Sequence, residues 1–222
     1  MKNRVFRLAH MVPFPPFALR EEGKSRGLAI DLLDRTLAEV NAGAIYIPVD
    51  QSRIEDLVDM GRADGIAFFA ITPERQARYD FSDALIATGG ALFLKKSNPS
   101  APDLAAFAGK TISTPRKGPL FSYIQKEFPQ ITIRATEDYP EAMELVLTGD
   151  AAAAALNLHS GIAMANQFYT GQFSLPDSAF LEINLAVAVP KGKCEVLLRL
   201  VNDGLARLAK EKYDEILEKW IG

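Results

Sequence analysis

The sequence predicts a two-lobed α/β protein in which each lobe is a mostly parallel sheet flanked by helices. Short apolar runs of strand type alternate with segments of helical spacing along the 222 residues, and this alternation is typical of βαβ units. The second half of the chain repeats the pattern of the first half, which indicates two lobes of similar design. A small-molecule ligand is then expected to bind between the lobes.

The composition excludes several classes of protein. Hydrophobic residues make up 48% and charged residues 24% of the chain, and the formal net charge is −3, which disfavours nucleic acid or an anionic membrane as the main partner. The single cysteine and the two distant histidines form no disulfide and no convincing metal set. The sequence has no apolar run of about 18 residues that would span a membrane, and no phosphate loop or dinucleotide fingerprint that would predict a cofactor.

The first half begins with a partly alternating strand at 5–10 and a loop at 11–17, where three prolines interrupt any regular pattern. Residues 29–40 carry apolar side chains at helical spacing, and the asparagine and glycine that follow are typical of a helix end. The further elements expected in this half are a polar turn at 21–24, strands at 45–49, 66–69 and 91–94, and a short helix at 53–60.

The strand at 66–69 leads into a helix start. Thr72 suits the N-cap, Pro73 the first helical position and Glu74 the first turn. A strand that ends where a helix begins brings backbone N–H groups and the cation Arg75 to one place. Such a place suits a carboxylate.

The second half follows the same alternation, after a charged, proline-bearing stretch at 95–102. The alanine run at 151–155 leaves the period of its segment unreadable, so residues 151–156 are expected to form a strand or a mixed element. The other expected elements are helices at 103–107, 120–128, 139–148 and 160–168, strands at 111–114, 131–135 and 185–189, and one or two helices over 195–220.

The segment from Asp64 to Ser82 resembles a known family. It contains Asp-Gly-Ile at 64–66, Ile-Thr-Pro-Glu-Arg at 71–75 and Asp-Phe-Ser at 80–82. This order is typical of the bacterial extracellular solute-binding proteins of the polar-amino-acid class. The resemblance extends over essentially the whole chain and implies the type II periplasmic-binding-protein fold, also called a Venus flytrap.

In that fold the chain crosses twice between the lobes, and the crossings set the expected domain boundaries. Residues 1–95 and 190–222 are assigned to lobe one, and residues 96–189 to lobe two. A two-segment hinge is expected near Lys95 and Pro190.

The resemblance implies that Arg75 forms a bidentate pair with a ligand carboxylate, for which its fork of N–H donors and permanent charge are suited. The alternative is a surface arginine near a helix start. The resemblance also implies that Phe14, held in a stiff proline loop, stacks on the ligand at little entropic cost. Phe17 is a second candidate in that loop, although packing in the core of lobe one suits it better.

Several positions depart from the family pattern. Relatives that bind α-amino acids usually carry hydroxyl residues where this chain has Ala67, Phe68 and Ala70. The backbone N–H of Ala70 can still serve a carboxylate. Because successive strand side chains point to opposite faces, one of Phe68 and Phe69 is expected to face the ligand and the other the core. The sequence leaves open which one does so, and Phe68 is retained as a candidate.

Lobe two carries weaker candidates. In relatives, the loop at Lys117, Gly118 and Pro119 caps the ligand carboxylate with backbone N–H groups; here Pro119 removes one donor, while Gly118 still allows close approach and Lys117 adds charge. The alternative is a solvated basic loop. Asn157 aligns roughly with an aspartate that holds the ligand ammonium, and its alternative is a turn-forming role.

The carboxylate half of the amino-acid site is therefore present, whereas the ammonium half is weakened. Burying an ammonium without a polar partner is costly. The predicted ligand is thus an organic acid or a modified amino acid with an apolar or aromatic body.

The leading functional hypothesis is an extracytoplasmic, periplasmic solute-binding protein that delivers its ligand to a membrane permease of ABC type. The alternative is the ligand-sensing domain of a membrane histidine kinase or similar receptor, and a third hypothesis is a periplasmic dehydratase. No catalytic residue is assigned, because no motif marks the lobe-two acids Glu141, Glu144 and Glu182. The N-terminus lacks a signal-peptide core, so we expect an export signal or anchor to be missing from this sequence; the alternative is a cytoplasmic protein.

Overall fold

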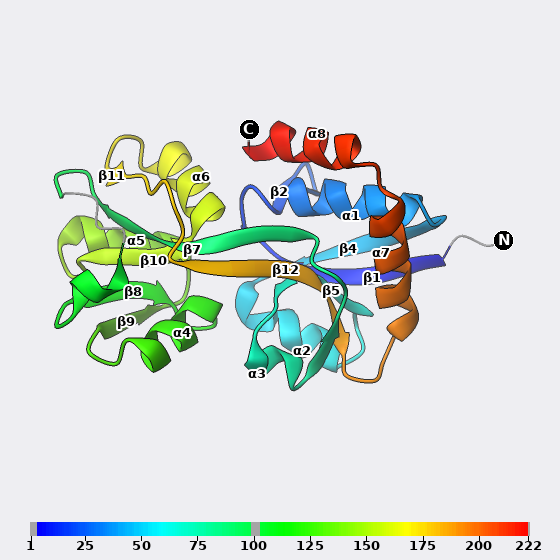
Figure 1. The fold of residues 1–222 in the computed structure, drawn as a ribbon, viewed down its shortest axis with the longest axis horizontal. Coiled ribbons are helices and arrows are strands. Elements are labelled where there is room, and N and C mark those ends of the chain that lie inside the picture. The colour runs from blue at the N-terminus through cyan, green and yellow to red at the C-terminus, as the bar shows by residue number, and fades with distance from the viewer. Residues whose placement is uncertain (1–3, 99–102, 222) are drawn as a thin grey trace. The chain divides into compact units, whose positions relative to one another are not determined.

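The computed structural model describes residues 4–98 and 103–221 and divides into two compact units (Figure 1). Unit 1 comprises Met1–Ala87 and Asn184–Gly222, and unit 2 comprises Thr88–Ile183. The divisions fall earlier in the chain than the expected hinge at Lys95 and Pro190. The reason is that strands β7 (Ile86–Lys95) and β12 (Leu181–Pro190) each begin in one unit and continue in the other. Residues 99–102 of the expected crossover lie outside the described residues.

Unit 1 is built on a mostly parallel sheet. Its strands β1 (Arg4–Met11), β4 (Ala42–Val49) and β5 (Gly65–Ala70) run parallel in the order β4-β1-β5, and β12 pairs antiparallel with β5. Helix α1 (Leu28–Ala38) packs on one face of this sheet, and α7 (Glu195–Arg207) and α8 (Lys210–Ile221) pack against α1. Toward the other face of the sheet lie η1 (Gln51–Arg53), α2 (Ile54–Asp59) and α3 (Pro73–Gln76) (Figure 1).

Helix α8, near the end of the chain, is hydrogen-bonded to α1. The Asp31 carboxylate accepts hydrogen bonds from Trp220 Nε1 at 2.9 Å and from Lys219 Nζ at 2.6 Å. The Tyr213 hydroxyl donates to the Leu85 carbonyl oxygen at 2.8 Å. Both ends of the chain thus contribute to the packing of unit 1.

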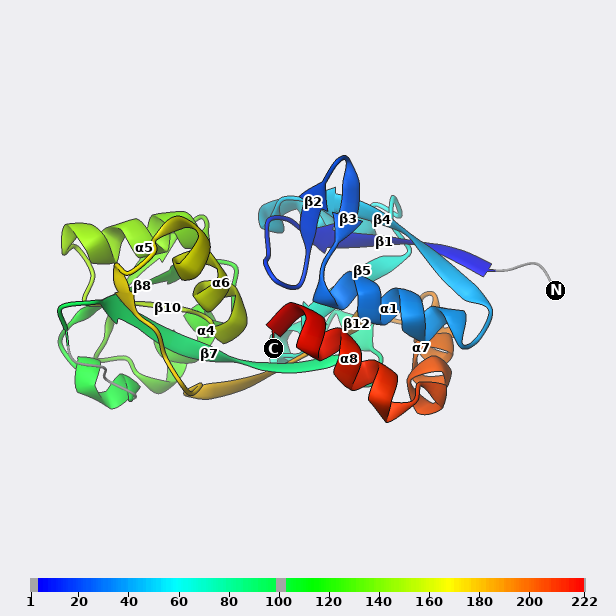
Figure 2. The same ribbon diagram turned by 90° about the horizontal axis from the view of Figure 1, so that it is seen from above.

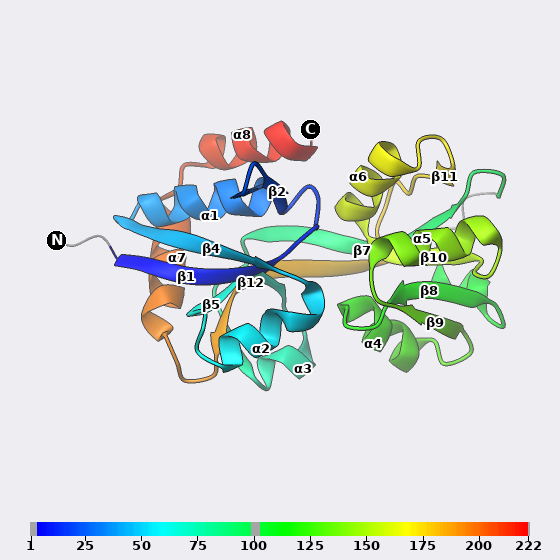
Figure 3. The ribbon, with the colours of Figure 1, turned by 180° about the vertical axis from the view of Figure 1, so that it is seen from behind.

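Unit 2 repeats the same plan (Figure 3). Strands β8 (Thr111–Pro115), β9 (Thr132–Thr136) and β10 (Ala153–Asn157) are parallel in the order β10-β8-β9, and β7 pairs antiparallel with β10. Its helices are η2 (Leu104–Phe107), α4 (Pro119–Glu127), α5 (Tyr139–Thr148) and α6 (Leu158–Phe168). The core contains Phe93, Met143, Leu156 and Met164. The last three alanines of the run at 151–155 lie in the buried strand β10, where small side chains allow α5 and α6 to approach closely.

The alternation of strands and helices predicted from the sequence is confirmed, but short strands were missed. Strands β2 (Leu19–Glu21) and β3 (Lys24–Arg26) form a hairpin at the position of the expected polar turn (Figure 2). Strands β6 (Tyr79–Phe81) and β11 (Phe173–Ser174) pair with β12 and β7. Segments of two or three residues are too short to show a period of two.

A glycine sets the closest approach of α7 to α1. A β-carbon added at Gly204 would lie 2.2 Å from the carbonyl oxygen of Thr36. The Thr36 side chain is itself fixed, because its hydroxyl donates to the Leu32 carbonyl oxygen at 2.8 Å. The two helix backbones can therefore meet only where α7 has no side chain.

We predict that Gly204→Ala lowers the free energy of unfolding by about 1–2 kcal/mol. A contact of 2.2 Å with a backbone oxygen places the overpacking cost in the upper part of its range, at about 2–3 kcal/mol, and the helix-propensity gain offsets about 1 kcal/mol of it. Urea unfolding measures the change. The neighbouring exposed Asp203→Ala is the matched control and is expected to stay within about 0.5 kcal/mol of wild type. A Gly204→Ala variant as stable as wild type would contradict the packing described here.

Candidate functional site: an arginine on the carboxyl edge of unit 1

The carboxyl ends of the parallel strands collect the candidate residues within each unit. In unit 1, β1 ends at Met11 ahead of the Phe14 loop, and β5 ends at Ala70 ahead of α3. In unit 2, β8 ends at Pro115 ahead of the loop to α4, and β10 ends at Asn157. Ligands of α/β proteins typically bind at this edge of a sheet. The candidates predicted from the sequence therefore fall into two groups, one in each unit.

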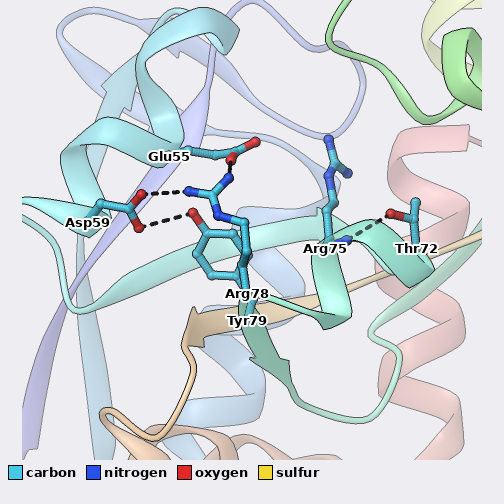
Figure 4. A network of polar contacts seen from close by, with 6 residues as sticks. All are labelled: Glu55, Asp59, Thr72, Arg75, Arg78 and Tyr79. Carbon is cyan, nitrogen blue, oxygen red and sulfur yellow. Dashed lines mark hydrogen bonds and ion pairs between the residues drawn. The ribbon is translucent and has the colours of Figure 1, made fainter.

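Arg75 contacts residues at the end of β5 and at the start of α3. Its backbone N–H donates to Thr72 Oγ1 at 3.3 Å, so Thr72 caps α3 as predicted (Figure 4). Its side-chain Nη1 donates to the Ala70 carbonyl oxygen at 3.1 Å. The guanidinium carbon lies 3.5 Å from the centre of the Phe69 ring. The side chain is partly buried against the end of β5.

The backbone of Ala70 faces the same side as this guanidinium. The Ile71 N–H donates to the Asn184 carbonyl oxygen at 2.9 Å, so the polar groups of Ile71 face β12. In a strand the N–H and C=O of one residue point to the same edge, and those of the next residue to the opposite edge. The Ala70 N–H therefore points away from β12, on the side where Arg75 reaches the Ala70 carbonyl. The two donors expected for a carboxylate lie together.

Helix α3 contributes less than the sequence suggested. It spans four residues, its first residue Pro73 has no N–H, and the N–H of Arg75 is bonded to Thr72. So short a helix has little macrodipole to offer an anion. The capacity to bind a carboxylate rests on the Arg75 side chain and the end of β5 instead.

Burial makes the charge on Arg75 costly. Desolvation is the main cause that lowers the pKa of Arg75 to about 10, and the nearby Glu55, Tyr79 and Glu74 act in the opposite direction. The guanidinium is still protonated at neutral pH. A bound anion would compensate for the hydration that this cation has lost.

A β-bulge in β5 decides how its two phenylalanines face. Ile66 lies opposite Ala188 and Phe69 opposite Ala186, so three steps along β5 match two steps along β12. One extra residue shifts the alternation of side chains. Ile66 and Phe69 therefore join the same cluster, together with Ile54 of α2. Both Phe68 and Phe69 are buried, with exposed fractions of 0% and 1%.

Phe68 belongs to a second group of rings, with both phenylalanines of the proline loop. The Phe14 ring stacks on that of Phe17 with centroids 5.0 Å apart and lies parallel to that of Phe68 at 6.3 Å. The loop is closed by paired backbone hydrogen bonds between Phe14 and Ala18. All three rings are buried, and Phe17 occupies the core position that suited it best.

His10 continues this group of rings at the end of β1. Its ring contacts those of Phe68 and Tyr46, with centroids 5.9 Å and 6.1 Å away. Nδ1 lies 3.2 Å from the Met11 carbonyl oxygen, and Nε2 lies 2.7 Å from Ser25 Oγ. Since a carbonyl only accepts, Nδ1 carries the hydrogen and neutral Nε2 accepts from the Ser25 hydroxyl. Desolvation lowers the pKa of His10 and favours this neutral form.

The candidate residues of unit 2 are engaged locally. The Gly118 N–H donates to the Pro115 carbonyl oxygen at 3.2 Å, and Gly118 precedes Pro119 at the start of α4. Lys117 is exposed. The loop therefore keeps one of its backbone donors for its own turn, in addition to the donor that proline removes.

Asn157 is the N-cap of α6 in unit 2. Its Oδ1 accepts the Ser160 N–H at 3.2 Å and so caps α6, and its Nδ2 donates to Thr88 Oγ1 at 3.1 Å. Nδ1 of His159 lies 2.8 Å from the same Thr88 hydroxyl oxygen. This polar cluster could not be predicted from the sequence, because Thr88 lies far from the other residues along the chain.

The described residues offer neither a metal-binding cluster nor a membrane-spanning helix. Among residues 4–98 and 103–221, no group of three or more histidine, cysteine, aspartate or glutamate side chains could hold a metal ion. No helix in the same part of the chain is long and apolar enough to cross a bilayer.

The fold, together with an arginine at the end of β5, indicates a solute-binding protein. The chain belongs to the bacterial extracellular solute-binding proteins, family 3, whose family model matches residues 6–222. The virulence sensor protein BvgS of Bordetella bronchiseptica is 24% identical over 224 residues, which cover 98% of this chain but 18% of that protein. The ABC transporter glutamine-binding protein GlnH of Bacillus subtilis is 27% identical over 206 residues, covering 90% of this chain and 74% of that protein.

Solved structures agree with the fold. The periplasmic VFT2 domain of Bordetella pertussis BvgS has a TM-score of 0.86 at 21% identity, covering 97% of this chain and 93% of that one. An ancestral arginine-binding protein bound to glutamine has a TM-score of 0.85 at 25% identity, with full coverage of both chains. The ancestral amino acid-binding protein AncCDT-1, a precursor of cyclohexadienyl dehydratase, has a TM-score of 0.83 at 24% identity, covering 98% and 96%. The two-lobed type II periplasmic-binding-protein fold predicted from the sequence is confirmed.

We predict that the stability of unit 1 falls as the pH drops below about 6.5. The folded pKa of His10 is lower than the ordinary value of 6.5, so the unfolded chain takes up the proton first and stability is lost between 6.5 and the lower folded pKa. NMR titration of the two histidine rings, assigned with His10→Gln, gives the folded midpoint. Urea-unfolded protein supplies the reference. A His10 midpoint above the unfolded value would contradict the neutral tautomer.

We also predict that the Arg75 guanidinium titrates near pH 10, well below the ordinary arginine value of 12.5. The ¹³Cζ chemical shift of Arg75 measures this directly, with Arg75→Lys used to assign the signal. A bound carboxylate favours the protonated form, so saturation with such a ligand is expected to raise the midpoint. An Arg75 signal that is unchanged from pH 7 to pH 11 would refute the described burial.

Proposed function

We propose that this chain is an extracytoplasmic solute-binding module that captures a small carboxylate-bearing ligand through Arg75 and the Ala70 N–H. The observation that carries this proposal is their placement on one side of the end of β5, with Arg75 Nη1 only 3.1 Å from the Ala70 carbonyl oxygen. A guanidinium and a backbone N–H together suit the planar, two-oxygen shape of a carboxylate.

The ligand we favour is an organic acid or a modified amino acid with an apolar or aromatic body. Ala67 and Ala70 offer no hydroxyl to an ammonium group, and Asn157 stands near the place of the family's aspartate. The rings of Phe14 and Phe68 form an apolar group on the same carboxyl edge as Arg75. Such surroundings would receive the body of the ligand more readily than a second charge.

Unit 2 is proposed to complete the site by hinge closure after unit 1 has bound the ligand. Lys117, Gly118, Pro119 and Asn157 remain its candidate contacts. Their support is their position at the carboxyl ends of β8 and β10. Among them, Lys117 is the candidate that carries a charge.

For the biological role we propose delivery of the ligand to an ABC-type membrane permease, in line with the similarity to GlnH. The second candidate is the ligand-sensing domain of a membrane histidine kinase or similar receptor. It is favoured by the match of 98% of this chain to sensor proteins of about five times its length. A transmembrane helix and a kinase domain encoded downstream would identify the sensor role, and a neighbouring permease gene the transport role.

An enzymatic role is a weaker proposal. Of the acids in unit 2, Glu141 has a structural role at the start of α5, where its N–H donates to Asp138 Oδ1 and its carboxylate accepts the Glu137 N–H. Glu144 and Glu182 are exposed. Incubation with prephenate-like acids, followed by absorbance for turnover, tests the dehydratase hypothesis, which the similarity to AncCDT-1 also raises.

The binding proposal predicts a specific pattern in calorimetry. A panel of aromatic and aliphatic acids, their primary amides and the common L-amino acids is titrated into wild type, Arg75→Lys and the exposed control Arg199→Lys. We expect an acid to bind at micromolar Kd, its amide to bind at least 100-fold more weakly, and Arg75→Lys but not Arg199→Lys to lose the preference. Micromolar binding of ordinary L-amino acids without binding of simple acids would overturn the proposed ligand class.

A further inference from the structure

We propose that Phe69 is the positioning residue of Arg75, and that its ring face sets the plane in which the guanidinium meets a carboxylate. This inference rests on the proposed function of Arg75. The guanidinium carbon lies 3.5 Å from the centre of the Phe69 ring, well within the range of a cation–π contact.

The bulge in β5 is what brings this ring beneath Arg75. Counting in twos from Ile66 would place Phe68, not Phe69, on the side of α2. The extra residue opposite Ala186 and Ala188 moves Phe69 to that side, and Phe68 joins Phe14 instead. The bulge therefore places Phe69 under the Arg75 guanidinium and Phe68 among the apolar rings.

The Phe69 ring is fixed from behind by Tyr79. The two rings meet edge to face, with centroids 5.8 Å apart. The Tyr79 hydroxyl donates to Asp59 Oδ1 at 3.2 Å, and Asp59 Oδ2 accepts from Arg78 Nη2 at 2.7 Å (Figure 4). Asp59 of α2 thus fixes the Tyr79 side chain, and the Tyr79 ring in turn fixes the Phe69 ring.

A second cation completes the arrangement. The Arg78 guanidinium carbon lies 5.3 Å from the centre of the Tyr79 ring, and its Nη1 pairs with Glu55 on α2 (Figure 4). Two arginines therefore contact two adjoining aromatic rings. Arg78 pairs with two carboxylates and is exposed, whereas Arg75 is partly buried, with its guanidinium over the Phe69 ring.

A ring face is a suitable support for a ligand-binding cation. It attracts the guanidinium through its π surface and accepts none of its in-plane N–H hydrogens, whereas a carboxylate support would compete with the ligand for them. The contact also restricts rotation of the guanidinium about its long side chain, which lowers the entropy lost on binding.

Fluorinated phenylalanines at position 69 test the proposal, because they keep the shape of the buried ring and weaken its negative face. The series is phenylalanine, 4-fluoro-, 3,5-difluoro- and 3,4,5-trifluorophenylalanine, with the same series at the core residue Phe93 of unit 2 as control. The readouts are the Arg75 ¹³Cζ titration without ligand and the calorimetric Kd of phenylacetate and phenylacetamide. Phe69→Leu, which removes the ring, is measured alongside.

We expect the Arg75 titration midpoint to fall stepwise with fluorine content at position 69, and phenylacetate binding to weaken by about 3–30-fold across the series. Phenylacetamide binding and the Phe93 series are expected to stay constant. An Arg75 midpoint that does not change along the Phe69 series would overturn the proposal, and would mean that the ring only fills the core. If phenylacetate does not bind wild type, this counts against the proposed function, while the ligand-free titration still decides the role of Phe69.

Discussion

The candidate site depends on a β-bulge, which places one extra residue of β5 between its pairings with Ala188 and Ala186 of β12. The strand pairing fixes where Ile66 and Phe69 lie, and the pairing of Ile71 with Asn184 fixes where the Ala70 N–H points. Helix α3 then begins at Pro73 and returns Arg75 to the end of the same strand. The positions of the Ala70 N–H and the Arg75 guanidinium, the two donors proposed for a ligand carboxylate, are thus set by a β-ladder. Paired strands are among the more rigid parts of a protein.

The same region combines stabilising and costly features. Phe69 and Tyr79 are buried in a core cluster with α2, and a partly buried cation lies directly on that cluster. Desolvation of a charge opposes folding, while the surrounding apolar burial favours it. The costly charge of Arg75 thus lies next to a buried core cluster of unit 1. Binding proteins commonly keep such unfavourable groups where a ligand can compensate for them.

The sequence was sufficient to predict where the main strands and helices lie. It was insufficient to predict which way some of their side chains point. Hydrophobic periods located the strands at 66–69 and 111–114 and the helix at 139–148, and Thr72 was correctly recognised as a cap. Phe68 and Phe69 join different groups of side chains, but the sequence could not assign each to its group, because a bulge is a property of two paired strands and only one strand is visible in a local pattern. Asn157 was ambiguous for a similar reason, since its partner Thr88 is distant in sequence.

The division of the chain into units has a consequence for biosynthesis. Unit 2 is one uninterrupted segment, Thr88–Ile183, whereas unit 1 needs both Met1–Ala87 and Asn184–Gly222. As domains tend to fold while the chain emerges, unit 2 has all its strands before the sheet of unit 1 has received β12. The edge of β5 that carries Phe69 and Ala70 stays unpaired until residues 184–190 are made. Unit 1, which carries the candidate site around Arg75, is therefore the last part of the newly made protein to complete its sheet.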